Sequence, residues 1–199
     1  KEETVIGLIQ PNVSYQLKSR KRIKIQGLGK AFSINGSDQF FDIEGLEYAN
    51  ARLIHRATGY YVQLVTFVPK EQPKKKIQET LGIDFGCSTA FTLSNGEKIS
   101  ANVPESERLK KLQKQQAKKV KGSKNFQKAV KKVRKEYQKI TNRKNDLANK
   151  IVAKVCQYET VVIQDEQLKS WHSGGHGKAV QHSVLGRVKT KLKSKSNVV

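Results

Sequence analysis

One short apolar stretch, Leu81-Gly82-Ile83-Asp84-Phe85-Gly86, predicts a buried β-strand with a single aspartate near its end. The glycines on either side of Asp84 leave room for backbone, a phosphate or a metal to approach its carboxylate. In an α/β sheet, ligands bind at the carboxyl ends of the strands. We therefore expect Asp84 to be a functional residue, the alternative being an aspartate that only caps a turn.

A second apolar strand, residues 160–163, ends in Gln164-Asp165-Glu166. If this strand lies beside the first, carboxylates from both meet at one edge of the sheet. Phosphodiester nucleases hold two Mg²⁺ ions between carboxylates paired in this way. Because side chains two apart share a face of a strand, Gln164 and Glu166 would point the same way and Asp165 the opposite way. The alternative is a strand end that is merely polar.

The segment between these strands predicts a β-hairpin and two helices. Residues 90–93 form a strand that turns at Ser94-Asn95-Gly96. The first helix is expected after Pro104, with Leu109, Leu112 and Val120 on one stripe. The second follows a turn at Gly122-Ser123, and its apolar residues recur mostly at steps of three and four, which favours an antiparallel helical hairpin: Phe126, Val130, Val133, Tyr137, Ile140, Leu147 and Ile151. An amphipathic helix at about 179–192 and a strand beginning at the last residues complete an α/β layer with inserted helices.

The N-terminal part of the chain, residues 4 to about 69, is typical of short β-strands. Residues 22–26 alternate basic and apolar, so Arg22 and Lys24 should line one wet, positive face. The strongest local signal is a hairpin from residues 51–56 to 60–68, rich in β-branched and aromatic residues on its return. We expect a small barrel or a curled sheet, followed by a Pro- and Lys-rich linker that marks a domain boundary.

Composition points to a polyanionic partner. The 199 residues hold 39 Lys+Arg against 17 Asp+Glu, a formal net charge of +22, which indicates nucleic acid or anionic lipid. No apolar run is long enough to span a membrane, and two cysteines, Cys87 and Cys156, fit a reducing cytosol. Since the chain has no Met and ends as a strand begins, we expect a fragment of a longer, cytoplasmic protein.

Much of the excess charge lies on the predicted helical hairpin. Residues 104–154 hold 18 Lys+Arg and 4 Asp+Glu, a local net charge of +14. The acids are too few for pairing along the helices, and aromatic residues lie among the lysines. Contact with phosphate backbones is therefore favoured over a merely solvated helix face. The expected nucleic-acid-binding residues are Arg22, Lys24, Lys111, Lys114, Lys118, Lys121, Lys124, Lys128, Lys131 and Arg143.

Two histidines, His172 and His176, stand four residues apart, and Cys156 lies upstream. A zinc site needs four ligands in a recognisable pattern, and the sequence has no CxxC. We therefore expect two surface histidines on a Gly-rich loop and no metal there.

Together these motifs resemble a known family. Residues 81–86 are similar to the first RuvC motif of the TnpB family of transposon-encoded RNA-guided nucleases, which is shared with compact type V CRISPR effectors. Residues 161–169 look like the family's second RuvC motif, and residues 52–68 like the end of its wedge barrel. Three further stretches resemble its helical insertion: residues 110–115, 121–125 and 142–147.

The resemblance implies a ribonuclease H-like (RuvC) domain at 80–199 with an inserted basic hairpin, truncated before the third acidic motif. Residues 1–70 would be a wedge-like β-barrel portion that grips guide RNA, and 71–79 a linker. The implied activity is cleavage of target DNA by two-metal hydrolysis with Mg²⁺, with Asp84 and Glu166 as catalytic residues and metal ligands. Zn²⁺ would bind only in a missing C-terminal part, and the protein would associate with the prokaryotic nucleoid.

One departure leaves alternatives open. The family usually has Glu followed by Asp at its second motif, and gapless alignment puts Gln164 on the Glu position. Glu166 is favoured as the working acid, and the chain alone, without a third Asp, should be inactive. The alternatives are a nuclease-inactive RNA-guided DNA-binding protein, a plain nucleic-acid-binding protein, and an actin-like or Hsp70-like ATPase fragment, whose first phosphate motif residues 82–89 resemble.

Overall fold

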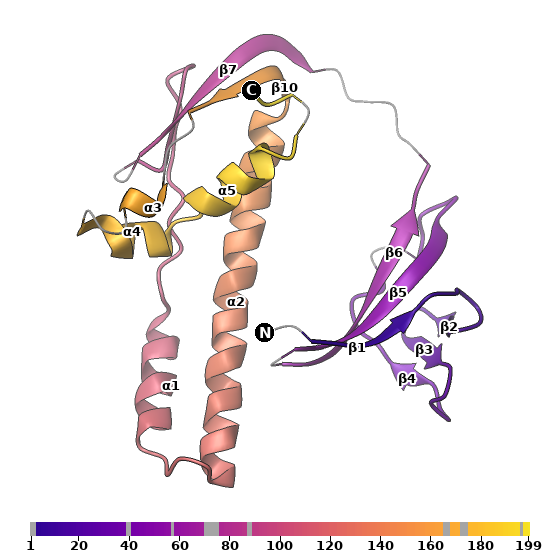
Figure 1. Cartoon of the computed structure of the whole chain (residues 1–199). Helices are drawn as coiled ribbons and strands as arrows, with labels where there is room; N and C mark the ends of the chain where they lie inside the picture. Colours follow the sequence, from indigo (N-terminus) through magenta and orange to yellow (C-terminus); the bar gives the residue numbers. More distant parts are fainter. Residues whose placement is uncertain are drawn as a thin grey trace. The chain divides into compact units, whose positions relative to one another are not determined.

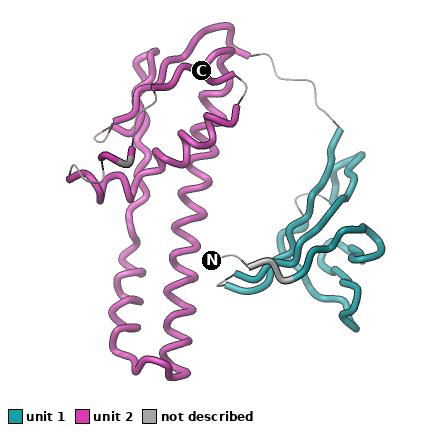
Figure 2. The backbone as a smooth tube through the Cα atoms, in the orientation of Figure 1, with its two compact units in different colours: residues 1–73 teal, residues 74–199 magenta. Residues whose placement is uncertain are grey.

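The structure, a computed structural model, describes residues 3–38, 41–56, 58–69, 76–86, 89–164, 168–171, 175–195 and 197–199. The chain divides into two compact units, Lys1–Pro73 and Lys74–Val199 (Figure 2). Each unit has a core of its own.

The first unit contains two antiparallel sheets. One has the order β1 (Glu3–Leu8), β5 (Glu47–Arg56), β6 (Gly59–Phe67), and the other β2 (Tyr15–Ser19), β3 (Arg22–Ile25), β4 (Phe32–Ser33). The predicted hairpin is confirmed, with β5 paired to β6 and Gly59, the first residue of β6, at a φ of 140°. The predicted alternation in β3 is confirmed as well, because Ile23 and Ile25 are buried while Arg22 and Lys24 are exposed.

The predicted barrel is wrong for the described residues. Closure needs a hydrogen-bonded ladder between every pair of neighbouring strands, and among the described strands no ladder joins one sheet to the other. The two sheets instead share one apolar core, to which Leu8 and Ala51 come from the first sheet and Tyr15, Ile23 and Ile25 from the second. They remain open layers, because side-chain packing and not backbone pairing connects them.

The second unit is built on a mixed sheet of order β10 (Tyr158–Ile163), β7 (Ile77–Phe85), β8 (Phe91–Leu93), β9 (Lys98–Ile99). β10 runs parallel to β7, and β8 and β9 are antiparallel to their neighbours. The C-terminal residues extend the sheet, since Val198 forms a parallel bridge with Val161, as the sequence predicted. β7 already includes residues 77–79, which we expected in the linker.

The helical hairpin consists of α1 (Glu107–Ala117) and α2 (Lys124–Val155), which lie side by side (Figure 1). Both helices begin at a serine N-cap: Ser106 accepts from the Leu109 amide and Ser123 from the Phe126 amide, each at 3.1 Å. The antiparallel pairing is confirmed. The prediction for Val120 is wrong, because α1 ends at Ala117 and Val120 is 77% exposed in the turn.

The two halves of α2 pack against different partners. Around its middle, Val133 and Ile140 form a small core with Leu109 of α1. Towards its end, α2 buries a second group of side chains in the core of the sheet: Ala148, Ile151, Val152 and Val155. One continuous helix thus connects the α/β core to the cationic hairpin.

The helix predicted at 179–192 is two helices, α4 (Gly177–His182) and α5 (Leu185–Leu192), which follow the short α3 (Leu168–Trp171). Backbone pairing with residues 101–103 interrupts the predicted helix between α4 and α5. The Val103 amide donates to the His182 carbonyl at 2.8 Å, and the Val184 amide donates to the Ala101 carbonyl at 3.0 Å. A residue held in extended pairing cannot continue the helical hydrogen bonds. Amphipathic spacing alone therefore predicted too long a helix.

Candidate functional site

Asp84 lies near the end of β7, the strand between β10 and β8. Its neighbours Ile83 and Phe85 are buried in the core, whereas Asp84 itself is exposed on the opposite face. Among the described residues, none forms a hydrogen bond or ion pair with its carboxylate. The carboxylate is therefore available to a ligand and is not used to hold the turn.

The parallel pairing of β7 with β10 brings the second predicted motif to the same edge. Ile163 pairs with Ile83, and Gln164 and Asp84 each come one residue after this pair. Gln164 is exposed like Asp84, and Val161 on the alternate face is fully buried. The sequence analysis expected the two polar strand ends to meet only if their strands are neighbours, and the two strands are neighbours in the sheet. Asp165 and Glu166 lie outside the described residues.

The two glycines near Asp84 differ in what the surrounding backbone requires of them. A Cβ on Gly86 would lie 2.6 Å from the carbonyl oxygen of Thr89, a separation that only glycine permits. The Gly82 amide donates to the Ser94 hydroxyl at 3.0 Å, and the Ser94 amide donates to the Gly82 carbonyl at 2.9 Å. The close approach of Thr89 therefore requires glycine at position 86. The Gly82 bonds use backbone groups that any residue has, and a Cβ there would make an ordinary 3.5 Å contact with the Ser94 Cβ.

Two oxygen donors are exposed at this edge of the sheet. The Asp84 carboxylate and the Gln164 amide are both exposed there, and oxygen ligands of this kind suit a hard divalent cation. In the part of the chain that the structure describes, no group of three or more His, Cys, Asp or Glu residues is arranged to hold a metal. His176 is exposed, while its predicted neighbour His172 lies outside the described residues.

The predicted binding residues of the hairpin form no ion pair with the acidic side chains that the structure describes. All eight predicted binding residues on it are exposed, and among the described residues none of the eight lies within 4.0 Å of a carboxylate. The ion pairs that do form use other lysines, such as Lys110 with Glu107 and Lys150 with Asp146. A surface of unpaired cations attracts a polyanion.

None of the described helices combines the length and apolar character of a membrane span.

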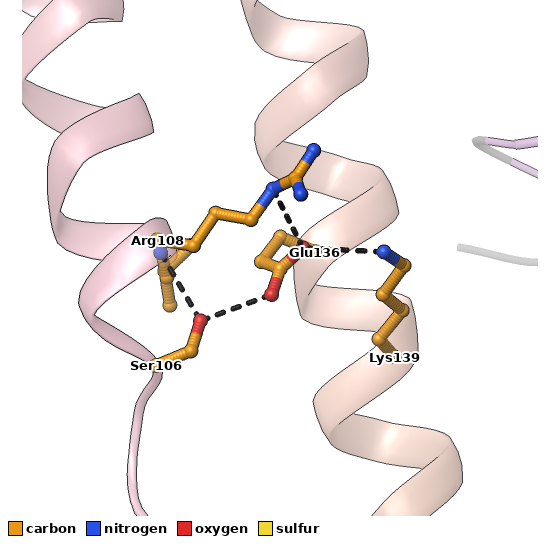
Figure 3. A network of polar contacts seen from close by, with 5 residues as sticks. Ser106, Arg108, Glu136 and Lys139 are labelled. Carbon is orange, nitrogen blue, oxygen red and sulfur yellow. Dashed lines mark hydrogen bonds and ion pairs between the residues drawn. The ribbon is translucent and has the colours of Figure 1, made fainter.

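A buried glutamate fixes α1 against α2 (Figure 3). Glu136 is 7% exposed and accepts a hydrogen bond from the Ser106 hydroxyl at 3.0 Å. The same carboxylate lies 3.6 Å from the Arg108 guanidinium and 3.7 Å from the Lys139 ammonium. Because Ser106 is also the N-cap of α1, Glu136 links the start of one helix to the middle of the other. Sequence reasoning missed this residue, although an acid among the apolar spacings of a basic helix was a usable signal.

We expect Glu136→Ala to lower the free energy of unfolding by about 1–3 kcal/mol, because it removes the acceptor of the part-buried Ser106 hydroxyl. Glu136→Gln should cost less than about 1 kcal/mol, since an amide oxygen still accepts from Ser106 and the two lost ion pairs involve exposed cations. The measurement is urea denaturation followed by circular dichroism at 222 nm. Glu107→Ala, which removes only an exposed ion pair, is the control. Equal losses for the Ala and Gln variants would show that the charge, and not the hydrogen bond, stabilises the hairpin.

Fold and surface together define a mixed α/β protein with an exposed aspartate at a strand end and a strongly cationic helical hairpin. The sequence model of the OrfB_IS605 family, described as "Probable transposase", matches residues 63–169, just over half of the chain, and the protein belongs to this family.

Two curated proteins are similar to the chain. A "Putative RNA-guided DNA endonuclease" of Streptomyces pristinaespiralis is 36% identical over 107 residues, which are 52% of this chain and 27% of that protein. The "Putative RNA-guided DNA endonuclease InsQ" of Escherichia coli (strain K12) is 26% identical over 137 residues, 67% of this chain and 34% of that protein. The chain thus spans about a third or less of the length of these relatives. The resemblance to the transposon-encoded family is confirmed.

Proposed function

We propose that the protein acts as an RNA-guided DNA endonuclease of the TnpB type, with a ribonuclease H-like, RuvC-type site. The observation that carries the proposal is the parallel pairing of β7 with β10. It brings the exposed Asp84 and the strand end that leads to Glu166 to one edge of the sheet. The names of the similar proteins support the same reaction.

The donors at this edge fit Mg²⁺, because the Asp84 carboxylate and the Gln164 amide offer oxygen ligands. Asp84 and Glu166 would hold the metal. When bound, Mg²⁺ would supply an activated water and would offset the negative charge of the leaving oxygen. The exposed position of Asp84, opposite the packed face of the sheet, lets a DNA strand reach it.

The cationic side chains would bind the nucleic acids. The lysines of α1 and α2 attract the phosphate backbone of the target DNA and hold it beside the sheet. Arg22 and Lys24, exposed on β3, would contact guide RNA in the same way. Sequence would be recognised by base pairing with the guide, while the protein binds backbone and shape.

A second function, RNA-guided DNA binding without cleavage, is favoured by one observation. Gln164, and not an acid, follows the β10 residue that pairs with Ile83. An amide carries no charge, so it binds a divalent cation more weakly than a carboxylate does.

Cleavage by the complete protein tests the proposal. Purified protein with its guide RNA and Mg²⁺ should cut a matched target DNA, and chelation of Mg²⁺ should stop the reaction. Intact DNA together with tight, guide-dependent binding would select the second function. Intact DNA without guide-dependent binding would contradict both.

The unpaired hairpin lysines should make DNA binding strongly dependent on salt. We expect the triple substitution of Lys114, Lys118 and Lys121 by Gln to weaken binding of this chain to duplex DNA, and to reduce the slope of log K against log[salt] by about 0.9 for each phosphate that the variant no longer neutralises. Fluorescence anisotropy at several salt concentrations measures both quantities. The matched control replaces Lys110, Lys150 and Lys154, which ion pairs already engage, and should change the slope less. Equal effects of the two triple variants would mean that only net charge matters.

A further inference from the structure

A groove of about 710 Å³ lies where α2 meets α4 and α5, and none of the cations predicted from the sequence is among its lining residues. Three of the residues that line it are cationic, Lys144 of α2 and Arg187 and Lys191 of α5, and none is acidic. Asn145 and Gln181 add polar side chains. A concave surface with three cations and no acid among its described lining residues is suited to an anion.

Contacts with neighbouring helices hold two of these cations in position. The Lys144 ammonium donates to the backbone carbonyl of Gln181 in α4, and the Arg187 guanidinium donates to the Asn145 side chain of α2 at 2.7 Å. Within the described part of the chain, no carboxylate lies within 4.0 Å of Lys144, Arg187 or Lys191. The remaining N–H groups of Arg187 therefore keep their capacity for a charged ligand.

The two cations also repel each other. Burial lowers the pKa of Lys144, the nearby Arg187 lowers it further, and Glu105 acts in the opposite direction. An anion between Lys144 and Arg187 would replace this repulsion by two attractions. The first turn of α5 would also attract an anion, because Gly186 and Arg187 line the groove and the N-terminal end of a helix carries partial positive charge.

We infer that this groove binds a backbone phosphate of a nucleic-acid strand, from either RNA or DNA, through Lys144, Arg187 and Lys191. The planar guanidinium can grip two phosphate oxygens while the lysines act as point charges. Lys144 directly follows Arg143, one of the cations predicted to bind nucleic acid, so a strand held along α2 can continue into the groove. The inference deepens the proposed function and rests on it only in taking the ligand to be nucleic acid.

Gly186 allows a test that does not disturb the cations. A Cβ built on it meets only a methyl group of Leu168, at 4.0 Å, an ordinary contact. Glu in the first turn of a helix is favourable, so Gly186→Glu should fold while it puts a carboxylate in the groove. Gly186→Gln is the neutral control of the same size. Gln157→Glu, an exposed position that does not line the groove, controls for net charge.

Binding of this chain to labelled single-stranded RNA, single-stranded DNA and duplex DNA gives the first result. We expect Gly186→Glu to bind about tenfold more weakly than Gly186→Gln and to lose about one unit of salt slope, while Gln157→Glu matches the wild type. A loss confined to RNA or to DNA would identify which strand supplies the phosphate. Equal binding by the Glu and Gln variants on all three nucleic acids would overturn the inference.

Inorganic phosphate gives a result that does not depend on nuclease activity. Phosphate should raise the melting temperature of the Gln variant more than that of the Glu variant, with chloride of equal ionic strength as the reference. An equal rise in the melting temperatures of the two variants would contradict phosphate binding in the groove, even if the chain binds nucleic acid. Failure of the complete protein to cleave, with the groove variants still differing in binding, would contradict the proposed function and leave the inference standing.

Discussion

Replacing Asp84 by Asn should reduce cleavage of target DNA by the complete protein by about 10³-fold or more, the loss expected when a metal ligand that stabilises charge in the transition state is removed. Asn has the same shape but no charge. The Asp84 side chain is exposed, and among the described residues it forms no hydrogen bond or ion pair. The substitution should therefore leave the packing of β7 unchanged and test Asp84 as the proposed metal ligand.

Cleavage assays with and without Mg²⁺, and guide-dependent binding of a matched DNA, measure the effect of Asp84→Asn. Binding should remain within a few-fold of the wild type, because in the proposed function base pairing with the guide and the cationic hairpin would supply it. Asp146→Asn, at an exposed carboxylate paired with Lys150, is the control and should cleave normally. Unchanged cleavage by Asp84→Asn would remove Asp84 from the site, and a lowered melting temperature would assign it a structural role.

Local patterns in the sequence predicted the parts of the fold that short-range physics determines. The alternation of Arg22, Ile23, Lys24 and Ile25 gave the correct faces of β3. The apolar spacing in α2 gave an antiparallel hairpin, because residues three and four apart share a helix face. The strand that contains Asp84 was recognised from its apolar run, and the structure adds the register with β10 that brings Gln164 next to it.

Contacts between distant segments decided the features that the sequence did not predict. The break between α4 and α5 depends on pairing with residues 101–103, which are remote in sequence. The burial of Glu136 depends on Ser106, thirty residues earlier. The absence of a closed barrel among the described strands of the first unit reflects how its two sheets pack, because a count of short strands does not encode ladder closure. The cationic groove likewise needs three helices brought together.

The second large effect that we expect is a loss of DNA cleavage when Glu166, the proposed second acidic metal ligand, is replaced. Gln164 and Glu166 would share a face if β10 continued past Ile163, since side chains alternate along a strand. We expect Glu166→Gln to reduce cleavage by the complete protein by about 10²–10³-fold, because a metal held by one carboxylate loses charge compensation. If Glu166 supplies the charge, Gln164→Glu should change cleavage less than about tenfold.

The paired measurement separates the two functions. If Glu166 is the ligand, Glu166→Gln abolishes cleavage while guide-dependent DNA binding persists, and adding a carboxylate at 164 to that variant restores part of the activity. If the protein binds DNA without cutting it, the wild type and Glu166→Gln are equally inactive, and Gln164→Glu alone creates Mg²⁺-dependent cleavage. The second outcome would follow from the register of the sheet, because position 164 comes directly after the β10 residue paired with Ile83, as Asp84 does on β7.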